Sequence, residues 1–332
     1  MHPLSRSRTS NAKPMRIAVL GRTHWLLSAA RRLQSLGHDL VLVATAPAQP
    51  EYLAKEEDYA ALATASGCPY YLSPDVNGAE FRSLLQSSDV DLVVSINWPS
   101  LVGAETCAIP RWGVFNCHGG DLPRYRGNAC ANWAILLGES RVGLCVHAMD
   151  PEAIDAGPIY ARRYHAINGE TYIGEILEWF NSAVPDAFVE AVDNLQRSNF
   201  VPEDQSESGV RPLRCHPRRA EDGAIDWGQS AVQVSRLVRA SSRPYQGAYA
   251  SLEGAELVII WRARIIDPEV DLLAVPGQII GPGEDGPRVA CGTGVIEIEE
   301  ASMAGGNVLP SNNRYRFRLR TPFRDLEGVK CG

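Results

Sequence analysis

The stretch from Arg16 to Ala44 limits the possible folds more than any other part of the chain. It opens with an apolar run over 16–20, continues with a helical pattern over 25–36, and closes with a second apolar run over 39–44. A strand, a helix and a strand at this spacing predict a βαβ unit. The turn after the first strand reads Gly21-Arg22-Thr23-His24, which lacks the GxGxxG pattern of nicotinamide-binding chains. We therefore expect an α/β fold with a parallel sheet and no nicotinamide-binding motif.

The same alternation of strands and helices continues to residue 200. Helices are predicted over 52–66, 80–88, 128–138 and 172–197, and strands near Tyr70 and over 91–96, 111–118 and 142–149.

Composition changes after residue 200. Residues 201–224 are polar and rich in Pro and Arg, which is typical of a linker. A helix is then predicted over 230–240, and short strands over 257–261, 278–280 and 295–299. Short strands separated by Gly and Pro favour a small β-barrel domain. The expected organisation is a disordered extension (1–14), a first domain (15–200), a linker (201–224) and a second domain (225–332).

The charge balance argues against nucleic acid as the main partner. The formal net charge is −7, whereas nucleic-acid-binding surfaces depend on clustered cations. No apolar run approaches the roughly 20 residues that a membrane helix needs. The polar start of the chain lacks the apolar region of a signal peptide, and the eight cysteines contain no CxxC pair. We therefore expect a cytoplasmic protein with reduced thiols.

Two short segments supply the candidate active-site residues. Asn116-Cys117-His118 ends the strand predicted over 111–118, and Asp155-Ala156-Gly157 follows further along the chain. Side chains alternate across a strand, so Asn116 and His118 point to one side and Cys117 to the other. A hydrogen-bond donor and a proton acceptor on the same side suit chemistry at a substrate carbonyl, whereas Cys117 is expected to pack as an apolar residue.

These segments and their surroundings resemble the formyltetrahydrofolate-dependent formyltransferases. That family includes methionyl-tRNA formyltransferase, glycinamide ribonucleotide formyltransferase and the sugar N-formyltransferases. The resemblance rests on Asn116-Cys-His-Gly-Gly-Asp-Leu-Pro-Arg-Tyr-Arg-Gly127, Trp133-Ala-Ile135, Gly138-Glu139, Gly143–Asp150 and Asp155-Ala-Gly157. It extends over residues 15–200, and Ile225-Asp-Trp227 with Leu237–Ala240 is similar to the C-terminal domain of the methionyl-tRNA enzymes.

The resemblance implies a Rossmann-like catalytic domain followed by an OB-like domain. It also implies transfer of a formyl group from N10-formyltetrahydrofolate, the donor co-substrate, to an acceptor amine. Asn116 would donate a hydrogen bond to the oxyanion, His118 would accept the proton of the amine, and Asp155 would orient and polarise His118. The amine attacks the formyl carbon directly, so no covalent enzyme intermediate is needed. No metal is expected, because His118 and Asp155 alone lack the three or four ligands of a zinc site.

The folate is expected at the carboxyl ends of the parallel strands, where open α/β sheets bind ligands. The predicted contacts are Ile96, Asn97, Trp98, Gly120, Asp121, Leu122, Pro123, Met149, Asp150 and Ile154. Relatives commonly carry Ser-Leu where this chain has Gly120-Asp121, so an acid is expected near the ligands.

Several side chains near these positions have two interpretations. Trp98 either stacks on a ring of the ligand or packs in the core. His147 either relays a proton or packs. Arg124 and Arg126 either meet an anionic group of a ligand or lie in solvent.

The acceptor is predicted to be the primary amine of a small molecule, with a nucleotide-linked amino sugar preferred. The methionyl-tRNA enzymes resemble one another in a basic, glycine-rich insertion after the second strand. Here the segment Ala46–Asp58 carries four acids and one lysine, which would repel a tRNA acceptor stem.

Three other functions stay open at this point. The acceptor could be an amino-acid-derived amine, such as hydroxyornithine of a siderophore pathway, or methionyl-tRNA. From a different class, the chain could hydrolyse formyltetrahydrofolate, with water in place of the amine. The β-rich second domain also offers strand edges through which two copies could form a homodimer.

Overall fold

The computed structural model describes residues 13–49, 52–253, 256–268, 272–303 and 318–320. The extension predicted over 1–14 lies outside these ranges except for its last two residues. The described residues form two compact units. The first contains the residues up to Gly127, Gly143–His165 and Glu178–Cys215, and the second contains Asn128–Val142, Ala166–Leu177 and the residues from His216 onward.

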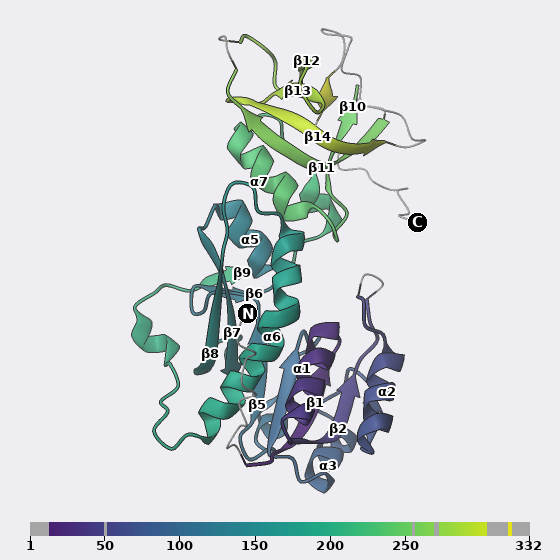
Figure 1. The fold of residues 1–332 in the computed structure, drawn as a ribbon, viewed down its shortest axis with the longest axis vertical. Helices are drawn as coiled ribbons and strands as arrows, with labels where there is room; N and C mark the ends of the chain where they lie inside the picture. Colours follow the sequence, from purple (N-terminus) through teal and green to yellow (C-terminus); the bar gives the residue numbers. More distant parts are fainter. Residues whose placement is uncertain (1–12, 50–51, 254–255, 269–271, 304–317, 321–332) are drawn as a thin grey trace, which may run out of the picture. The chain divides into compact units, whose positions relative to one another are not determined.

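The first unit is built on a seven-stranded sheet with the order β3-β2-β1-β4-β5-β7-β8 (Figure 1). The strands are β1 (Arg16–Gly21), β2 (Asp39–Thr45), β3 (Tyr70–Leu72), β4 (Leu92–Ile96), β5 (Val114–His118), β7 (Arg141–Ala148) and β8 (Ile159–Ala166). Neighbouring strands from β3 to β5 are parallel, whereas β7 runs antiparallel to β5. The predicted Rossmann-like α/β fold is therefore confirmed.

Helices pack around this sheet. They are α1 (His24–Ser35), α2 (Glu56–Ser66), α3 (Ala79–Ser87), α4 (Ala104–Cys107) and α6 (Ile173–Gln196). In α1, the side chain of Thr23 accepts a hydrogen bond from the backbone N–H of Leu26 and so caps the helix. One face of α1 buries Leu26, Leu27 and Leu33, while Arg31 on the other face is exposed. This separation of apolar and polar faces holds the helix against the sheet.

The register of the central strands places several loops at one edge of the sheet. Leu20 of β1 lies opposite Ser95 of β4, and Ser95 lies opposite Asn116 of β5. All three strands run in the same direction, so the residues that follow them leave the sheet at its carboxyl edge. Arg22, Asn97 and His118 are therefore neighbours at this edge, although the sequence separates them widely.

The sequence did not predict three strands of the first unit. β8 has the sequence IYARRYHA, in which Arg162 and Arg163 interrupt the apolar pattern. The other two are β6 (Tyr125–Gly127) and β9 (Leu213–Cys215), which pair in parallel as a separate two-stranded sheet. The segment predicted to be a linker over 201–224 thus contains ordered structure, because β9 pairs with a strand that lies far away in the sequence.

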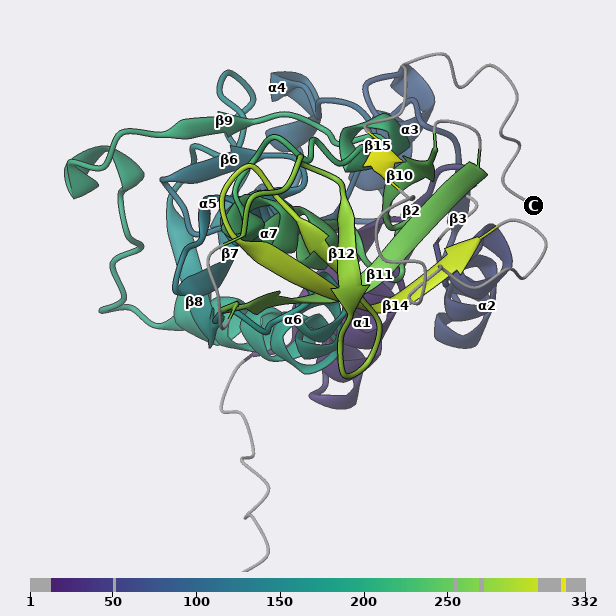
Figure 2. The same ribbon diagram turned by 90° about the horizontal axis from the view of Figure 1, so that it is seen from above.

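The second unit combines α5 (Cys130–Leu137) and α7 (Ala231–Ser241) with a six-stranded sheet (Figures 1 and 2). Its strands lie in the order β12-β13-β14-β11-β10-β15, and the pairs with a resolved register are antiparallel. They are β10 (Ala248–Leu252), β11 (Glu256–Ile266), β12 (Ile279–Pro282), β13 (Pro287–Ala290), β14 (Val295–Met303) and β15 (Leu319–Arg320). α7 packs on β11, and Trp227, Val238 and Ile260 lie in their common core.

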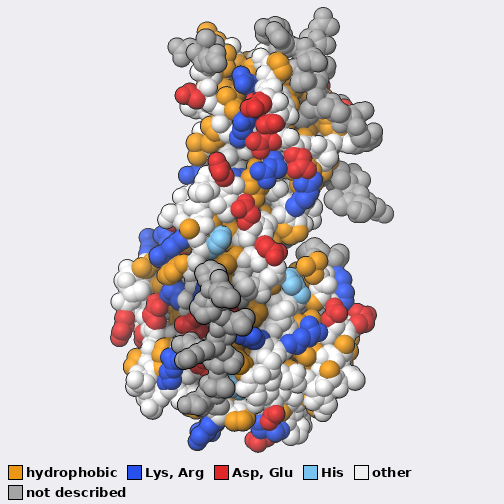
Figure 3. Space-filling view, in the orientation of Figure 1, with side chains coloured by type: hydrophobic (Ala, Val, Ile, Leu, Met, Phe, Trp, Pro, Cys, Tyr) orange, Lys and Arg blue, Asp and Glu red, His pale blue; other side chains and the backbone are white. Residues whose placement is uncertain are grey.

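Charged side chains of both signs alternate on the surface of the second unit. Arg243 pairs with Glu300 at 2.7 Å and Arg262 with Glu299 at 3.6 Å. Figure 3 shows blue and red side chains side by side in this unit. Such pairing cancels charge locally at these four side chains.

Candidate active site

The three residues predicted to carry the chemistry lie together in the first unit. β5 presents Asn116 and His118, and the loop after β7 presents Asp155. His118 Nδ1 lies 3.4 Å from Asp155 Oδ2. His147 of β7, which pairs with Asn116 in the sheet, completes a group of four that we call the site cluster: Asn116, His118, His147 and Asp155.

The hydrogen bonds of His118 indicate which of its nitrogens is basic. Nε2 lies 2.7 Å from the main-chain oxygen of Tyr125. A carbonyl oxygen can only accept, so Nε2 carries a proton and donates it. In the neutral imidazole the lone pair is then on Nδ1, the nitrogen that faces Asp155. A proton taken up by His118 would therefore arrive beside the carboxylate.

His147 orients the amide of Asn116. Its Nδ1 lies 2.8 Å from the oxygen of Ala148, so Nδ1 donates and Nε2 is the acceptor. Asn116 Nδ2 lies 3.4 Å from this Nε2, which favours the rotamer that directs the NH2 group, rather than the amide oxygen, towards His147. One amide hydrogen is used in this contact and the second is available to a ligand. His147, for which the sequence left a proton relay or packing open, thus contacts both Asn116 and Asp155, the latter at 3.4 Å.

The backbone around Asp155 explains the Asp-Ala-Gly pattern. Asp155 has a positive φ of 53°, and its Oδ2 accepts a hydrogen bond of 2.8 Å from the N–H of Gly127. At Gly157 the chain passes so close to β7 that an added Cβ would lie 2.0 Å from the oxygen of Ala148. Only glycine fits such an approach, so Gly157 holds the loop in the conformation that presents Asp155.

Burial and neighbouring groups together set the protonation states of His118 and Asp155. Burial lowers the pKa of His118, and the smaller opposing effect of the Asp155 carboxylate does not cancel this. Burial acts to raise the pKa of Asp155, but His118 and the N–H of Gly127 hold it below its ordinary range. His118 is therefore a neutral base at neutral pH beside an ionised carboxylate. The unfolded chain protonates this histidine more readily than the folded protein does. The free energy of unfolding therefore decreases as the pH falls from the ordinary histidine value towards the lowered pKa of His118.

Cys117 lies between the two strand residues but has a different role. Its side chain is buried, and burial raises the pKa of its thiol well above the usual value. A neutral, buried thiol is a poor nucleophile. The packing role predicted for Cys117 agrees with this environment.

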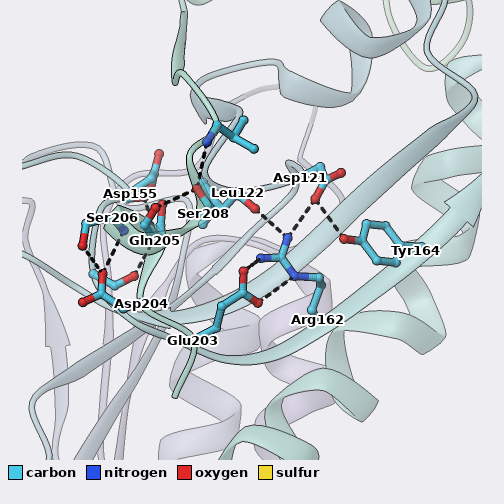
Figure 4. A network of polar contacts seen from close by, with 12 residues as sticks. Asp121, Leu122, Asp155, Arg162, Tyr164, Glu203, Asp204, Gln205, Ser206 and Ser208 are labelled. Atoms are coloured by element: carbon cyan, nitrogen blue, oxygen red, sulfur yellow. Dashed lines mark hydrogen bonds and ion pairs between the residues drawn. The ribbon is translucent and has the colours of Figure 1, made fainter. Parts of the chain in front are cut away.

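A buried glutamine from the predicted linker supports the Asp155 loop (Figure 4). Gln205 Nε2 donates to the main-chain oxygens of Asp155 at 2.9 Å and Gly157 at 2.7 Å. Arg126 donates to Gln205 Oε1 at 2.8 Å, so this arginine supports the loop. Gln205 could not be predicted, because a single glutamine in a polar segment has no distinguishing pattern.

Replacing Gln205 by Leu is expected to loosen this loop. Two buried carbonyls would lose their donor, which costs on the order of 1–3 kcal/mol each. We expect a lower melting temperature and a lower kcat, measured by thermal unfolding and by release of tetrahydrofolate. Ser206→Ala, at the exposed neighbouring position, is the matched control. Equal rates for Gln205→Leu and the control would show that the loop holds Asp155 without Gln205.

The acid expected near the ligands is already paired within the protein. Asp121 Oδ1 accepts hydrogen bonds from Arg162 Nη1 at 2.8 Å and from the hydroxyl of Tyr164 at 3.2 Å (Figure 4). Arg162 also pairs with Glu203 at 2.6 Å and donates to the oxygen of Leu122. These contacts connect the turn that contains Gly120, Asp121, Leu122 and Pro123 to β8. The Asp121 carboxylate therefore stabilises the turn.

The other predicted folate contacts follow β4 and β7. Ile96 is buried, and Asn97 has a positive φ of 55° and donates to the hydroxyl of Tyr52 at 2.6 Å. Trp98 packs against an apolar cluster that includes Met149, and its Nε1 is buried with no hydrogen-bond partner in the described residues. Asp150 accepts from the N–H of Glu152, and Ile154 is exposed. Folate contact by these residues stays a prediction.

The described residues contain no group of three or more His, Cys, Asp or Glu side chains that could hold a metal ion. Among the helices of the same residues, none is long and apolar enough to cross a membrane.

An amide donor, a neutral imidazole and a carboxylate at the carboxyl edge of an α/β sheet define a site for group transfer at a carbonyl carbon. A family model described as formyl transferase matches residues 15–192, and a model of the formyl transferase C-terminal domain matches residues 218–316. The chain belongs to the formyl transferase family, which confirms the resemblance found in the sequence.

The curated relatives include methionyl-tRNA formyltransferases. That of Citrifermentans bemidjiense is 29% identical over 304 residues, which cover 90% of this chain and 92% of the relative. That of Methylococcus capsulatus is 29% identical over 294 residues, which cover 88% of this chain and 93% of the relative.

Solved structures with the same fold include two proteins of other kinds. The N-formyltransferase from Helicobacter canadensis, solved with folinic acid and dTDP-3-aminofucose, has a TM-score of 0.62 at 13% identity, covering 86% of this chain and 98% of that chain. HypX from Aquifex aeolicus, solved with tetrahydrofolic acid, has a TM-score of 0.54 at 21% identity, covering 90% of this chain and 46% of that chain.

Proposed function

We propose that the protein transfers a formyl group from N10-formyltetrahydrofolate to the primary amine of a small molecule, with a nucleotide-linked amino sugar as the first candidate. The observation that carries the formyl transfer is the site cluster, in which Asn116 offers an amide hydrogen and His118 offers a neutral Nδ1 beside Asp155. The folate is supported by the ligands named for structures of the same fold.

In the proposed reaction the amine nitrogen attacks the formyl carbon and the carbonyl oxygen becomes an oxyanion. The free amide hydrogen of Asn116 donates to this oxyanion. Nδ1 of His118 takes the proton of the attacking nitrogen, and the resulting imidazolium forms an ion pair with Asp155. When the tetrahedral intermediate collapses, the bond to N10 breaks and His118 returns the proton to N10. Tetrahydrofolate and the formylated amine leave, and the site cluster regains its starting state.

The local charge supports a small acceptor over tRNA. The first turn of α2 carries Glu56, Glu57 and Asp58. These acids have structural uses, since Glu56 accepts from the N–H of Ala48 and Asp58 accepts from that of Lys55. They still place negative charge where a tRNA backbone would have to approach. The shared fold with a protein solved with an aminofucose nucleotide also supports the sugar acceptor.

Methionyl-tRNA is the second candidate acceptor. Two observations favour it: the curated relatives carry that name over nearly the whole chain, and the C-terminal family model matches the second unit.

An acceptor screen distinguishes the candidates. Release of tetrahydrofolate from N10-formyltetrahydrofolate is followed with dTDP-linked amino sugars, hydroxyornithine and charged initiator tRNA offered one at a time. We expect turnover with an amino sugar. Turnover with tRNA or hydroxyornithine alone would replace the proposed acceptor, and equal release without any acceptor would indicate the hydrolase.

A further inference from the structure

Arg22 is a buried cation at the carboxyl edge of the sheet, and the reaction proposed above does not use it. It follows β1 directly and is 7% exposed. Its Nε donates to the main-chain oxygen of Asn97 at 3.0 Å, and its guanidinium lies over the ring of Tyr52 at 5.4 Å. Among the described residues it forms no ion pair with a carboxylate.

The polar contacts of Arg22 are incomplete. Neither Nη atom of Arg22 donates a hydrogen bond to another described residue. Both Nη atoms keep some contact with solvent, since neither is among the fully enclosed polar atoms that lack a partner. By contrast Arg239, the other buried arginine of the described residues, directs Nη1 to the main-chain oxygens of Asn168 and Thr171. A buried cation without a counter-charge is costly, so the state of Arg22 suits a site that an anion completes.

Arg22 lies beside the N-terminus of α1. The first turn of α1, which begins two residues later, contains no acidic residue. The positive end of the helix dipole therefore adds to the charge of Arg22. Asn97 and Tyr52 are held together by their own hydrogen bond of 2.6 Å, so the two groups that fix the guanidinium are themselves fixed.

The spacing between β1, which precedes Arg22, and β5, which carries Asn116, indicates which molecule could supply the anion. Leu20, Ser95 and Asn116 lie in one row across β1, β4 and β5. Neighbouring strands are about 4.8 Å apart, so Asn116 lies roughly 10 Å from the end of β1. One strand thus separates the two positions, so a small molecule can place an amine at the site cluster and an anionic group at Arg22.

We infer that Arg22 binds the phosphate groups of the acceptor, and that the acceptor is a phosphorylated small molecule whose amine and phosphate lie at opposite ends. A guanidinium suits this task because its N–H groups match two phosphate oxygens at once. The inference rests on the proposed function, since the phosphate is placed relative to the formylated amine.

The test measures binding of inorganic pyrophosphate and, separately, of 5-formyltetrahydrofolate to the full-length protein by calorimetry. The variants are Arg22→Met and Arg22→Lys, with Arg31→Met on the exposed face of α1 as the matched control. We expect Arg22→Met to weaken pyrophosphate binding roughly 10- to 100-fold. Arg22→Lys keeps the charge and loses the paired donors, so its affinity for pyrophosphate should be intermediate. This variant also serves as a control in case Arg22→Met does not fold. Binding of 5-formyltetrahydrofolate should stay unchanged in Arg22→Lys, whose ammonium can still donate to the oxygen of Asn97, a predicted folate contact.

Three results would overturn the inference: no pyrophosphate binding by the unaltered protein, equal binding by Arg22→Met and Arg31→Met, or loss of 5-formyltetrahydrofolate binding in Arg22→Lys, which would assign Arg22 to the folate. The outcome is separable from that of the acceptor screen. Turnover with an amino sugar but no effect of Arg22 on pyrophosphate would reject this inference alone. Pyrophosphate binding through Arg22 with no turnover for any amine would reject the proposed function and leave the anion site.

Discussion

Replacing His118 by Asn is expected to lower kcat on the order of 10²- to 10⁴-fold, the range that a positioned general base contributes. The amide of asparagine can occupy the place of Nδ1 and donate to Asp155, so the buried site keeps one polar partner while losing the basic nitrogen. The shorter side chain does not reach the oxygen of Tyr125, which Nε2 of His118 contacts. The measurement is release of tetrahydrofolate with the acceptor identified by the screen, together with binding of 5-formyltetrahydrofolate. We expect that binding to remain near normal.

Two controls make the result of His118→Asn specific. The melting temperature must be close to that of the unaltered protein, because a damaged β5 would remove Asn116 from the site as well. Cys117→Ala, at the neighbouring position whose side chain points away, should retain most of the activity. Unchanged turnover in His118→Asn would remove the general base from the proposed reaction.

Replacing Asp155 by Asn is expected to lower kcat about 10²-fold or more, since the imidazolium that forms on His118 would lose its counter-charge. The pH dependence of kcat/KM shows in which direction Asp155 shifts the pKa of His118. Burial holds the pKa of His118 below its ordinary value of about 6.5, and the carboxylate opposes this. kcat/KM of the unaltered protein should therefore fall only in acid, below that ordinary value. In the variant the acid limb should move to still lower pH, on a lower plateau.

The opposite movement of the acid limb would contradict this account of Asp155. A limb shifted to higher pH would mean that the carboxylate lowers the basicity of the histidine. An unshifted limb with a reduced plateau would indicate that Asp155 acts only through the loop geometry. Glu152→Gln, in the same loop but on an exposed residue, is the matched control.

The parts of the structure that depend on local pattern were predictable. The βαβ unit over 16–44 follows from apolar periodicity, and the pair Asn116 and His118 follows from the alternation of side chains along a strand. His118 and Asp155 were brought together by the resemblance, because no local pattern relates a strand end to a loop so far along the chain.

The parts that depend on long-range pairing were missed. β8 was hidden because Arg162 and Arg163 replace apolar residues, and the acids that partner them lie elsewhere in the sequence. Gln205 gave no signal because its importance comes from two carbonyls of a distant loop. The ion pair of Asp121 with Arg162 was missed for the same reason, whereas the expected position of Asp121 near the ligands stays a prediction.

The reversal of strand direction between β5 and β7 has a consequence for how this site can vary. Asn116 and His147 face each other through a fixed antiparallel register, and Gly157 is held against the oxygen of Ala148. A one-residue slip of β7 would turn His147 to the opposite face of the sheet, so insertions within that strand should be excluded. The loop from Asp150 to Ile154 lies between these two anchors. We therefore expect a change in the length of this loop to leave His147 and Gly157 in place.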